Sequence, residues 1–157
     1  MEMVIYISIL TLVTAALISV VISVLSTFGK LKGYEEVAYT GTVVLERMSR
    51  EIRRAGSIDT VMSSFGTNPS SLSLVTTDLS DNPTTVRFSV AGGRVMIQEG
   101  VAAAVPLSNN RVSISDFTLT RIIGTNSDGV LIELTLERTI SNGTTTKQFR
   151  SFVVLDG

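Results

Sequence analysis

The sequence predicts an α+β protein in which one long N-terminal helix packs on a C-terminal antiparallel β-sheet domain. Three observations carry this prediction. Met3–Phe28 has no charged residue, residues 37–55 repeat apolar side chains at helical spacing, and short alternating segments rich in β-branched residues follow Gly56. The expected parts are an apolar helix over 1–28, an amphipathic helix half over 29–56 and a sheet domain over 57–157.

The segment Met3–Phe28 is apolar on every side, and at a rise of about 1.5 Å per residue it makes a helix of roughly 39 Å. This exceeds the ~30 Å hydrocarbon core of a bilayer. Such a helix is expected to lie in lipid or against copies of itself. A cleaved signal peptide is the weaker alternative, because the run is longer than an h-region of about 7–15 residues and lacks a basic n-region and a small-x-small cleavage site.

The second half of the expected helix carries one apolar stripe. Its members are Val37, Gly41, Val44, Leu45, Met48, Ile52 and Ala55. The arginines between Arg47 and Arg54 fall on the other side, where they are expected to form a solvated face that complements the helix dipole. No proline occurs from Met1 to Asn68, so we expect one helix from near Met1 to about Ala55, with Gly56 as its stop signal.

The remaining chain is predicted to be a single antiparallel meander of about five to seven strands. The strand candidates are Leu72–Thr76, Thr85–Val90, Arg94–Gln98, Phe117–Ile123, Val130–Thr139 and Lys147–Leu155. Gly92-Gly93 and Asn142-Gly143 are typical of two-residue hairpin turns. The amphipathic half of the helix is expected to cover one face of this sheet.

Composition narrows the classes of function. The 157 residues include no cysteine and no histidine, and the formal net charge is −1. Disulfides, thiolate metal sites and cysteine catalysis are thereby excluded, and the commonest general base is missing. There is no basic field for nucleic acid, no catalytic spacing of carboxylates and no phosphate-binding glycine loop. We therefore expect no catalytic residue, no metal site and no cofactor, and a protein that is not an enzyme.

Glu2 is the single acid next to the apolar segment. A carboxylate beside hydrocarbon is costly unless it is paired. Two interpretations remain open from the residues. Glu2 is either an ordinary interfacial acid outside a membrane helix, or a charge that pairs with a positive group, such as the α-amino group of a neighbouring copy, when helices pack.

A charge-free helix that opens with one glutamate, continues as an amphipathic helix and leads into a β-domain resembles the type IV pilins and type II secretion pseudopilins. Glu2-Met3-Val4-Ile5 and the apolar run after it carry this resemblance. The segment Leu45–Gly56 (LERMSREIRRAG) is similar to the helix end of minor pilins and minor pseudopilins of the W and J kinds. The resemblance covers about the first third of the chain, and the β-region matches in type.

This resemblance implies a subunit that the apolar helix holds in the cytoplasmic membrane and that assembly machinery then moves into a filament with copies of itself or other pilins, outside the cell or in the periplasm. Glu2 would pair with a neighbour's N-terminus, which this family methylates. The family's functions of adhesion, motility and secretion follow as expectations. A basic leader ending in glycine is expected upstream of Met1, and it would offset Lys30 and Lys32, which lie on the side expected to be outside.

Two family features are missing from this sequence: the proline within the apolar helix and the disulfide-bounded C-terminal loop. If the helix unwinds locally during assembly, the expected weak points are Ser19, Ser23, Gly29 and Gly33. Two alternatives to a pilus subunit stay open, a minor pseudopilin of a secretion system and a monomeric single-pass anchor whose β-domain binds or adheres. A monomeric anchor needs neither an acid at its buried end nor a rigid extension to Ala55.

Overall fold

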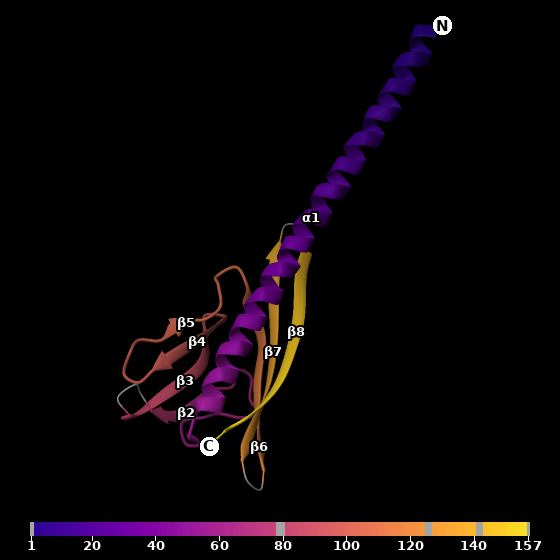
Figure 1. Cartoon of the computed structure of the whole chain (residues 1–157). Helices are drawn as coiled ribbons and strands as arrows, with labels where there is room; N and C mark the ends of the chain where they lie inside the picture. The colour runs from indigo at the N-terminus through magenta and orange to yellow at the C-terminus, as the bar shows by residue number, and fades with distance from the viewer. Residues whose placement is uncertain (1, 78–80, 125–126, 141–142, 157) are drawn as a thin grey trace.

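The computed structural model describes residues 2–77, 81–124, 127–140 and 143–156 (Figure 1). One helix is followed in this part of the chain by eight strands. They are α1 (Glu2–Arg54), β1 (Ser57–Ile58), β2 (Leu72–Thr77), β3 (Pro83–Ala91), β4 (Arg94–Glu99), β5 (Val105–Pro106), β6 (Ser113–Ile123), β7 (Asp128–Ile140) and β8 (Gly143–Val154). The predicted α+β class, with one long helix on antiparallel sheet, is confirmed.

Helix α1 is a single continuous helix of 53 residues. It ends one residue before the predicted end. The amide of Ala55 still donates to the Ile52 carbonyl at 3.3 Å, and the amide of Gly56 donates to the Val75 carbonyl of β2 at 3.0 Å. Gly56, which lies two residues after the end of α1, therefore already hydrogen-bonds to the sheet.

The strands form two antiparallel sheets, with the orders β1-β2-β3-β4-β5 and β6-β7-β8. The predicted single meander is wrong at the connection between β4 and β6. Strand β5 is only Val105–Pro106, and proline has no amide hydrogen for a ladder. The edge of β6 is instead covered by the loop after β1, through Ser70 N–Phe117 O at 2.8 Å and Gly66 N–Leu119 O at 2.9 Å.

Each predicted strand lies almost entirely within an observed one. Among the residues that the structure describes, the strands that were not predicted are the two-residue strands β1 and β5. The Gly92-Gly93 turn is confirmed, because Ala91 pairs with Arg94 and both glycines have positive φ, 57° and 69°. Ile140 pairs with Gly143 at the end of the β7–β8 hairpin. Asn142, the other half of the second predicted turn, lies outside the described residues.

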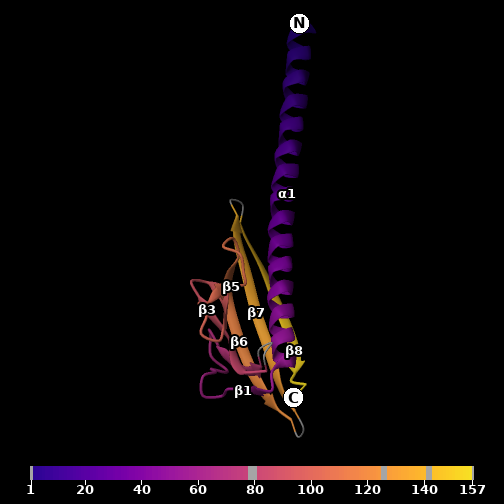
Figure 2. The same cartoon turned by 60° about the vertical axis from the view of Figure 1, so that its left-hand side comes forward.

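The core lies where the second half of α1 meets both sheets. The helix packs mainly on β7 and β8 and also contacts β2. Its buried residues Val44, Met48 and Ile52 join one cluster with Phe88 of the five-stranded sheet and Phe117 of the three-stranded sheet. Figure 2 shows the result: the C-terminal half of α1 runs along the sheets, and its N-terminal half extends beyond them.

Candidate assembly surface

The N-terminal half of α1, Met3–Phe28, is here called the stalk. Its large apolar side chains are between 47% and 79% exposed, from Val24 to Met3. Leaving one such side chain in water rather than burying it costs about 1.5–3 kcal/mol. The stalk therefore requires lipid or other protein around it. The helix that contains the stalk is long enough and apolar enough to cross a membrane.

Hydroxyl groups interrupt the apolar surface of the stalk, but they bond within the helix. Ser8 donates to the Val4 carbonyl at 2.7 Å, and Thr14 donates to the Leu10 carbonyl at 2.8 Å. The carbonyl of Ser23 accepts from the hydroxyls of both Ser26 and Thr27. Back-bonded hydroxyls of this kind need no water, so the stalk can enter an apolar environment with these groups satisfied.

The four expected weak points lie within continuous helix. Ser19 donates its hydroxyl to the Ala16 carbonyl at 2.8 Å. Gly29 has open space around the position of a Cβ atom, whereas Gly33 is buried and faces Thr145 of β8. Local unwinding at these residues stays a prediction.

The predicted stripe faces the sheets. Six of its seven members are buried and Leu45 is half-buried against the core: Val37, Gly41, Val44, Leu45, Met48, Ile52 and Ala55. Ala55 lies one residue beyond the end of α1. The helix thus consists of the free stalk and the remainder of α1, here called the docked half. This division follows from an apolar first half and an amphipathic second half, because the amphipathic half buries only one side.

An ion-pair group near the upper end of the docked half joins α1 to the three-stranded sheet. Glu36 lies 2.5 Å from Nη1 of Arg138 on β7 and 3.5 Å from Nη1 of Arg111, which precedes β6. The same Arg138 Nη1 donates to the Lys32 carbonyl at 3.4 Å. Glu36 and Arg138 are largely covered, with side chains 21% and 16% exposed, so this pair is less screened by solvent than a surface pair.

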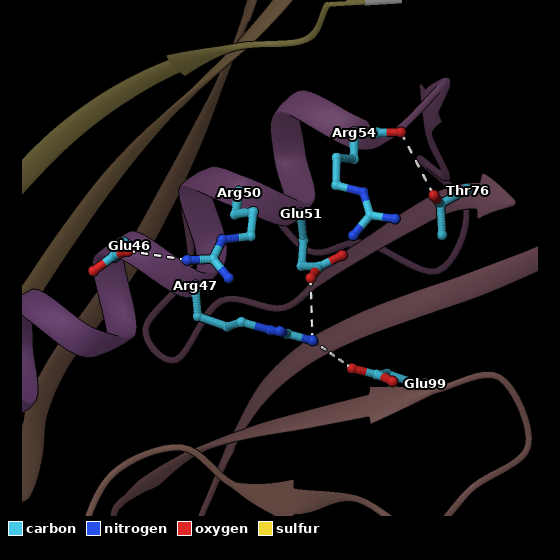
Figure 3. Close-up of polar contacts among 7 residues, drawn as sticks. All are labelled: Glu46, Arg47, Arg50, Glu51, Arg54, Thr76 and Glu99. Carbon is cyan, nitrogen blue, oxygen red and sulfur yellow. Dashed lines mark hydrogen bonds and ion pairs between the residues drawn. The ribbon is translucent and has the colours of Figure 1, made fainter. Parts of the chain in front are cut away.

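A second ion-pair group joins α1 to the five-stranded sheet, and it corrects the expectation of a solvated arginine face. Nη2 of Arg47 lies 3.1 Å from Glu51 and 2.6 Å from Glu99 at the end of β4 (Figure 3). Glu51 is buried, so Arg47 is the cation that compensates a carboxylate inside the helix–sheet junction. Arg50 does match the expectation, since it pairs with Glu46 on the exposed side.

Sequence reasoning missed Glu36 and Arg138 as docking residues. The one available signal was that Glu36 directly precedes the stripe residue Val37 in the sequence. Nothing in the sequence pairs Glu36 with an arginine about a hundred residues later, because that contact depends on how β7 lies against α1.

The assembly residue expected from sequence, Glu2, lies in the first turn of α1 at the free end of the stalk. Its side chain lies outside the described part of the structure. Among the described residues, no group of three His, Cys, Asp or Glu side chains is close enough to hold a metal ion. The exposed apolar side chains of the stalk are thus the feature that makes it the candidate assembly surface.

Comparisons of the chain with protein-family models, with curated proteins and with solved structures gave no significant match.

Proposed function

We propose that the protein is a structural subunit of a type IV pilus-like filament. The observation that carries this proposal is the contrast between the two halves of α1. The large apolar side chains of the stalk are exposed, while the docked half is joined to both sheets through the ion pairs Glu36–Arg138 and Arg47–Glu99. These two ion pairs would fix the orientation of the stalk relative to the domain. A repeating assembly requires the same orientation in every copy.

Before assembly, the stalk would hold the subunit in the membrane. In the filament, stalks of many copies would bundle and replace lipid by protein. Both environments bury the same apolar side chains, so transfer between them keeps the hydrophobic stabilisation of the stalk. The back-bonded hydroxyls of Ser8 and Thr14 fit either environment.

Glu2 would pair with the N-terminus of a neighbouring copy and thereby set the step between subunits. A carboxylate at the apolar end of a helix needs a positive partner once it is buried. Pairing between copies would supply this partner in the filament.

The alternative is a monomeric single-pass anchor whose β-domain binds a partner. Such an anchor requires only the apolar span. The continuous 53-residue helix and its two ion-pair groups favour the filament subunit over this alternative.

The proposal is tested by shearing surface appendages from cells that express the chain, imaging them by cryo electron microscopy and identifying their contents by mass spectrometry. A filament whose main component is this chain supports a main subunit, and trace amounts in filaments support a minor pilin or pseudopilin. Confinement of the chain to the membrane fraction, with no filaments containing it, overturns the filament proposal and leaves the monomeric anchor.

A further inference from the structure

A groove of about 490 Å³ lies where α1 leaves the domain, between the helix and the paired ends of β7 and β8. Gly33 allows the hairpin to lie close to the helix here, since a Cβ atom at this position would be 3.6 Å from Oγ1 of Thr145 and 3.9 Å from Ile140. Figure 1 shows the ends of β7 and β8 beside α1 at this point. The groove is lined by Thr27, Leu31 and Tyr34 of α1 and by Ile140, Gly143, Thr144 and Thr145 of the hairpin.

The same side of α1 continues toward the N-terminus as a second hollow of about 170 Å³. Thr27 and Leu31 line both hollows, which therefore form one track from the stalk to the domain. The other residues of the upper hollow are Ser23, Val24 and Phe28. No residue that lines the track carries a charge.

Hydroxyl groups in the track bond within the chain. Thr27 donates to the Ser23 carbonyl at 2.9 Å, and the hydroxyl oxygens of Thr144 and Thr139 lie 3.4 Å apart. A hydroxyl that already has a partner does not require a further polar group. The hydroxyls of Thr27 and Thr144 are therefore compatible with an apolar occupant.

The charged residues at this level lie on other sides. Lys32 leaves α1 about 100° around the helix axis from Leu31. Lys147 is not among the residues that line the groove, and its ammonium lies 4.8 Å from the ring centre of Tyr34. The groove is thus suited to an occupant that is uncharged as well as apolar.

A bilayer that holds the stalk does not cover this groove. The charge-free segment ends at Phe28 and, at roughly 39 Å, already exceeds the ~30 Å hydrocarbon core. The wall of the groove reaches Tyr34, which lies beyond Lys30 in the helix. Leu31 and Tyr34 are 55% and 49% exposed, so in the membrane-held state their apolar surface remains outside the hydrocarbon.

We propose that the groove seats the stalk of a second copy in the assembled filament. Each copy carries a stalk whose apolar side chains its own fold leaves exposed and whose sequence is free of charge from Met3 to Phe28. Contact between two apolar surfaces removes both from water. The groove thereby makes a contact of domain with stalk, in addition to the contact of stalk with stalk. The proposal rests on the proposed function.

The seated stalk belongs to a copy that is displaced along the filament axis toward the domain. For parallel stalks, a displacement of at least about 9 Å brings Phe28 of that copy level with Tyr34, so that its lysines clear the groove. A displacement beyond about 36 Å would carry its Met3 past Thr27. The two copies are therefore offset by between about 9 Å and about 36 Å.

The test uses cysteine cross-linking, because the natural chain has no cysteine. Full-length chains with Thr144→Cys are assembled into filaments with chains that carry one cysteine at each position from 3 to 28 in turn. Cysteine is close to threonine in size, and the proposal gives the Thr144 hydroxyl no role. We expect oxidation to link the two kinds of chain at stalk positions three or four residues apart, since one side of the seated helix faces the groove. The linked positions should give an offset within the stated range.

Two matched variants in the Thr144→Cys chain interpret the links. Leu31→Glu places a carboxylate in the groove, and Lys32→Glu places one on another side of α1. Each new glutamate lies four residues before a natural one, Glu35 or Glu36. Per incorporated copy, Leu31→Glu should lower the linked fraction by at least about tenfold, because a buried unpaired charge is unfavourable. Lys32→Glu should leave that fraction unchanged.

A separate set of filaments, in which Leu17→Cys replaces Thr144→Cys, reports contact of stalk with stalk. If Leu17→Cys links to other stalks and Thr144→Cys links to none, stalk bundling stands and the groove contact is excluded. Links of Thr144→Cys with itself in place of stalk links would assign the groove to a contact between hairpins. Equal loss of links with Leu31→Glu and Lys32→Glu, or no loss with either, would also overturn the inference. Absence of all links from Leu17→Cys, by contrast, contradicts the proposed function itself.

Discussion

The ring of Phe149 lies directly on Gly41, so α1 and β8 meet without a side chain from the helix between them. A Cβ atom at position 41 would overlap the Cζ, Cε2 and Cε1 atoms of this ring. Gly41 is buried, and Phe149 packs against the core from the inner face of β8. The glycine thus sets how closely the docked half of α1 approaches the three-stranded sheet.

We expect Gly41→Ala to destabilise the protein by about 1–3 kcal/mol, because the added methyl group must push α1 away from Phe149. Helix propensity acts in the opposite direction by about 1 kcal/mol, so a net loss would show that the close approach dominates. The measurement is denaturant unfolding of the full chain in detergent. In a Phe149→Leu background the same substitution should cost less, and an equal cost in both backgrounds would contradict the contact.

Gly129→Ala is the matched control for this effect. A Cβ atom there would also lie 2.6 Å from a ring, that of Phe152. Phe152 is 51% exposed on the outer face of β8, so its ring can move into solvent. We expect a change within about 1 kcal/mol, since a flexible exposed neighbour relieves the overlap and alanine suits a strand better than glycine does. A loss as large as that of Gly41→Ala would contradict the expectation that the exposed ring of Phe152 moves aside.

Arg47→Met should destabilise the junction of α1 and β4 more than Arg50→Met. Arg47 compensates the buried Glu51, and an unpaired buried acceptor costs about 1–3 kcal/mol. Arg50 and Glu46 form an exposed pair within the helix, which contributes about 0.3–0.5 kcal/mol. Thermal unfolding followed by circular dichroism compares the two variants. Equal shifts in Tm would mean that Glu51 is compensated in another way.

Substitutions of the two arginines that contact Glu36 should also differ in how much they destabilise the protein. Arg138 lies 2.5 Å from Glu36 and is mostly covered, whereas Arg111 lies 3.5 Å away with a side chain that is 65% exposed. We expect Arg138→Met to cost about 1–3 kcal/mol and Arg111→Met less than about 1 kcal/mol. Raising the salt concentration should remove the effect of Arg111→Met first, because solvent screens the exposed pair more strongly. A larger loss for Arg111→Met would contradict the order inferred from burial.

Glu2→Gln tests the role of the stalk end in assembly. If Glu2 pairs with a neighbouring N-terminus in the filament, the loss of one partner of a buried pair should lower incorporation by at least about tenfold. The amount of chain in the membrane fraction should not change, since the apolar stalk is intact. Immunoblots of sheared filaments and membranes measure both quantities. Wild-type incorporation of Glu2→Gln would show that Glu2 is an ordinary interfacial acid.

The sequence alone determined the two halves of α1, because apolar periodicity reports directly which sides of a helix avoid water. The absence of charge from Met3 to Phe28 predicted the exposed stalk, and the stripe from Val37 to Ala55 predicted the buried face. The main strands and the Gly92-Gly93 turn were also predictable, since alternation and positive φ are local properties of the chain.

Only the tertiary structure decided the division into two sheets, the partners of Glu36, the contact of Arg47 with Glu99, and the contact of Gly41 with Phe149. Each of these joins residues far apart in the chain. A glycine in an apolar stripe gives no indication of the ring that lies on it, and an arginine on a polar helix side gives none of the carboxylate that it reaches on β4. Such contacts depend on how helix and sheets lie against one another, and a local pattern of residue types does not encode that placement.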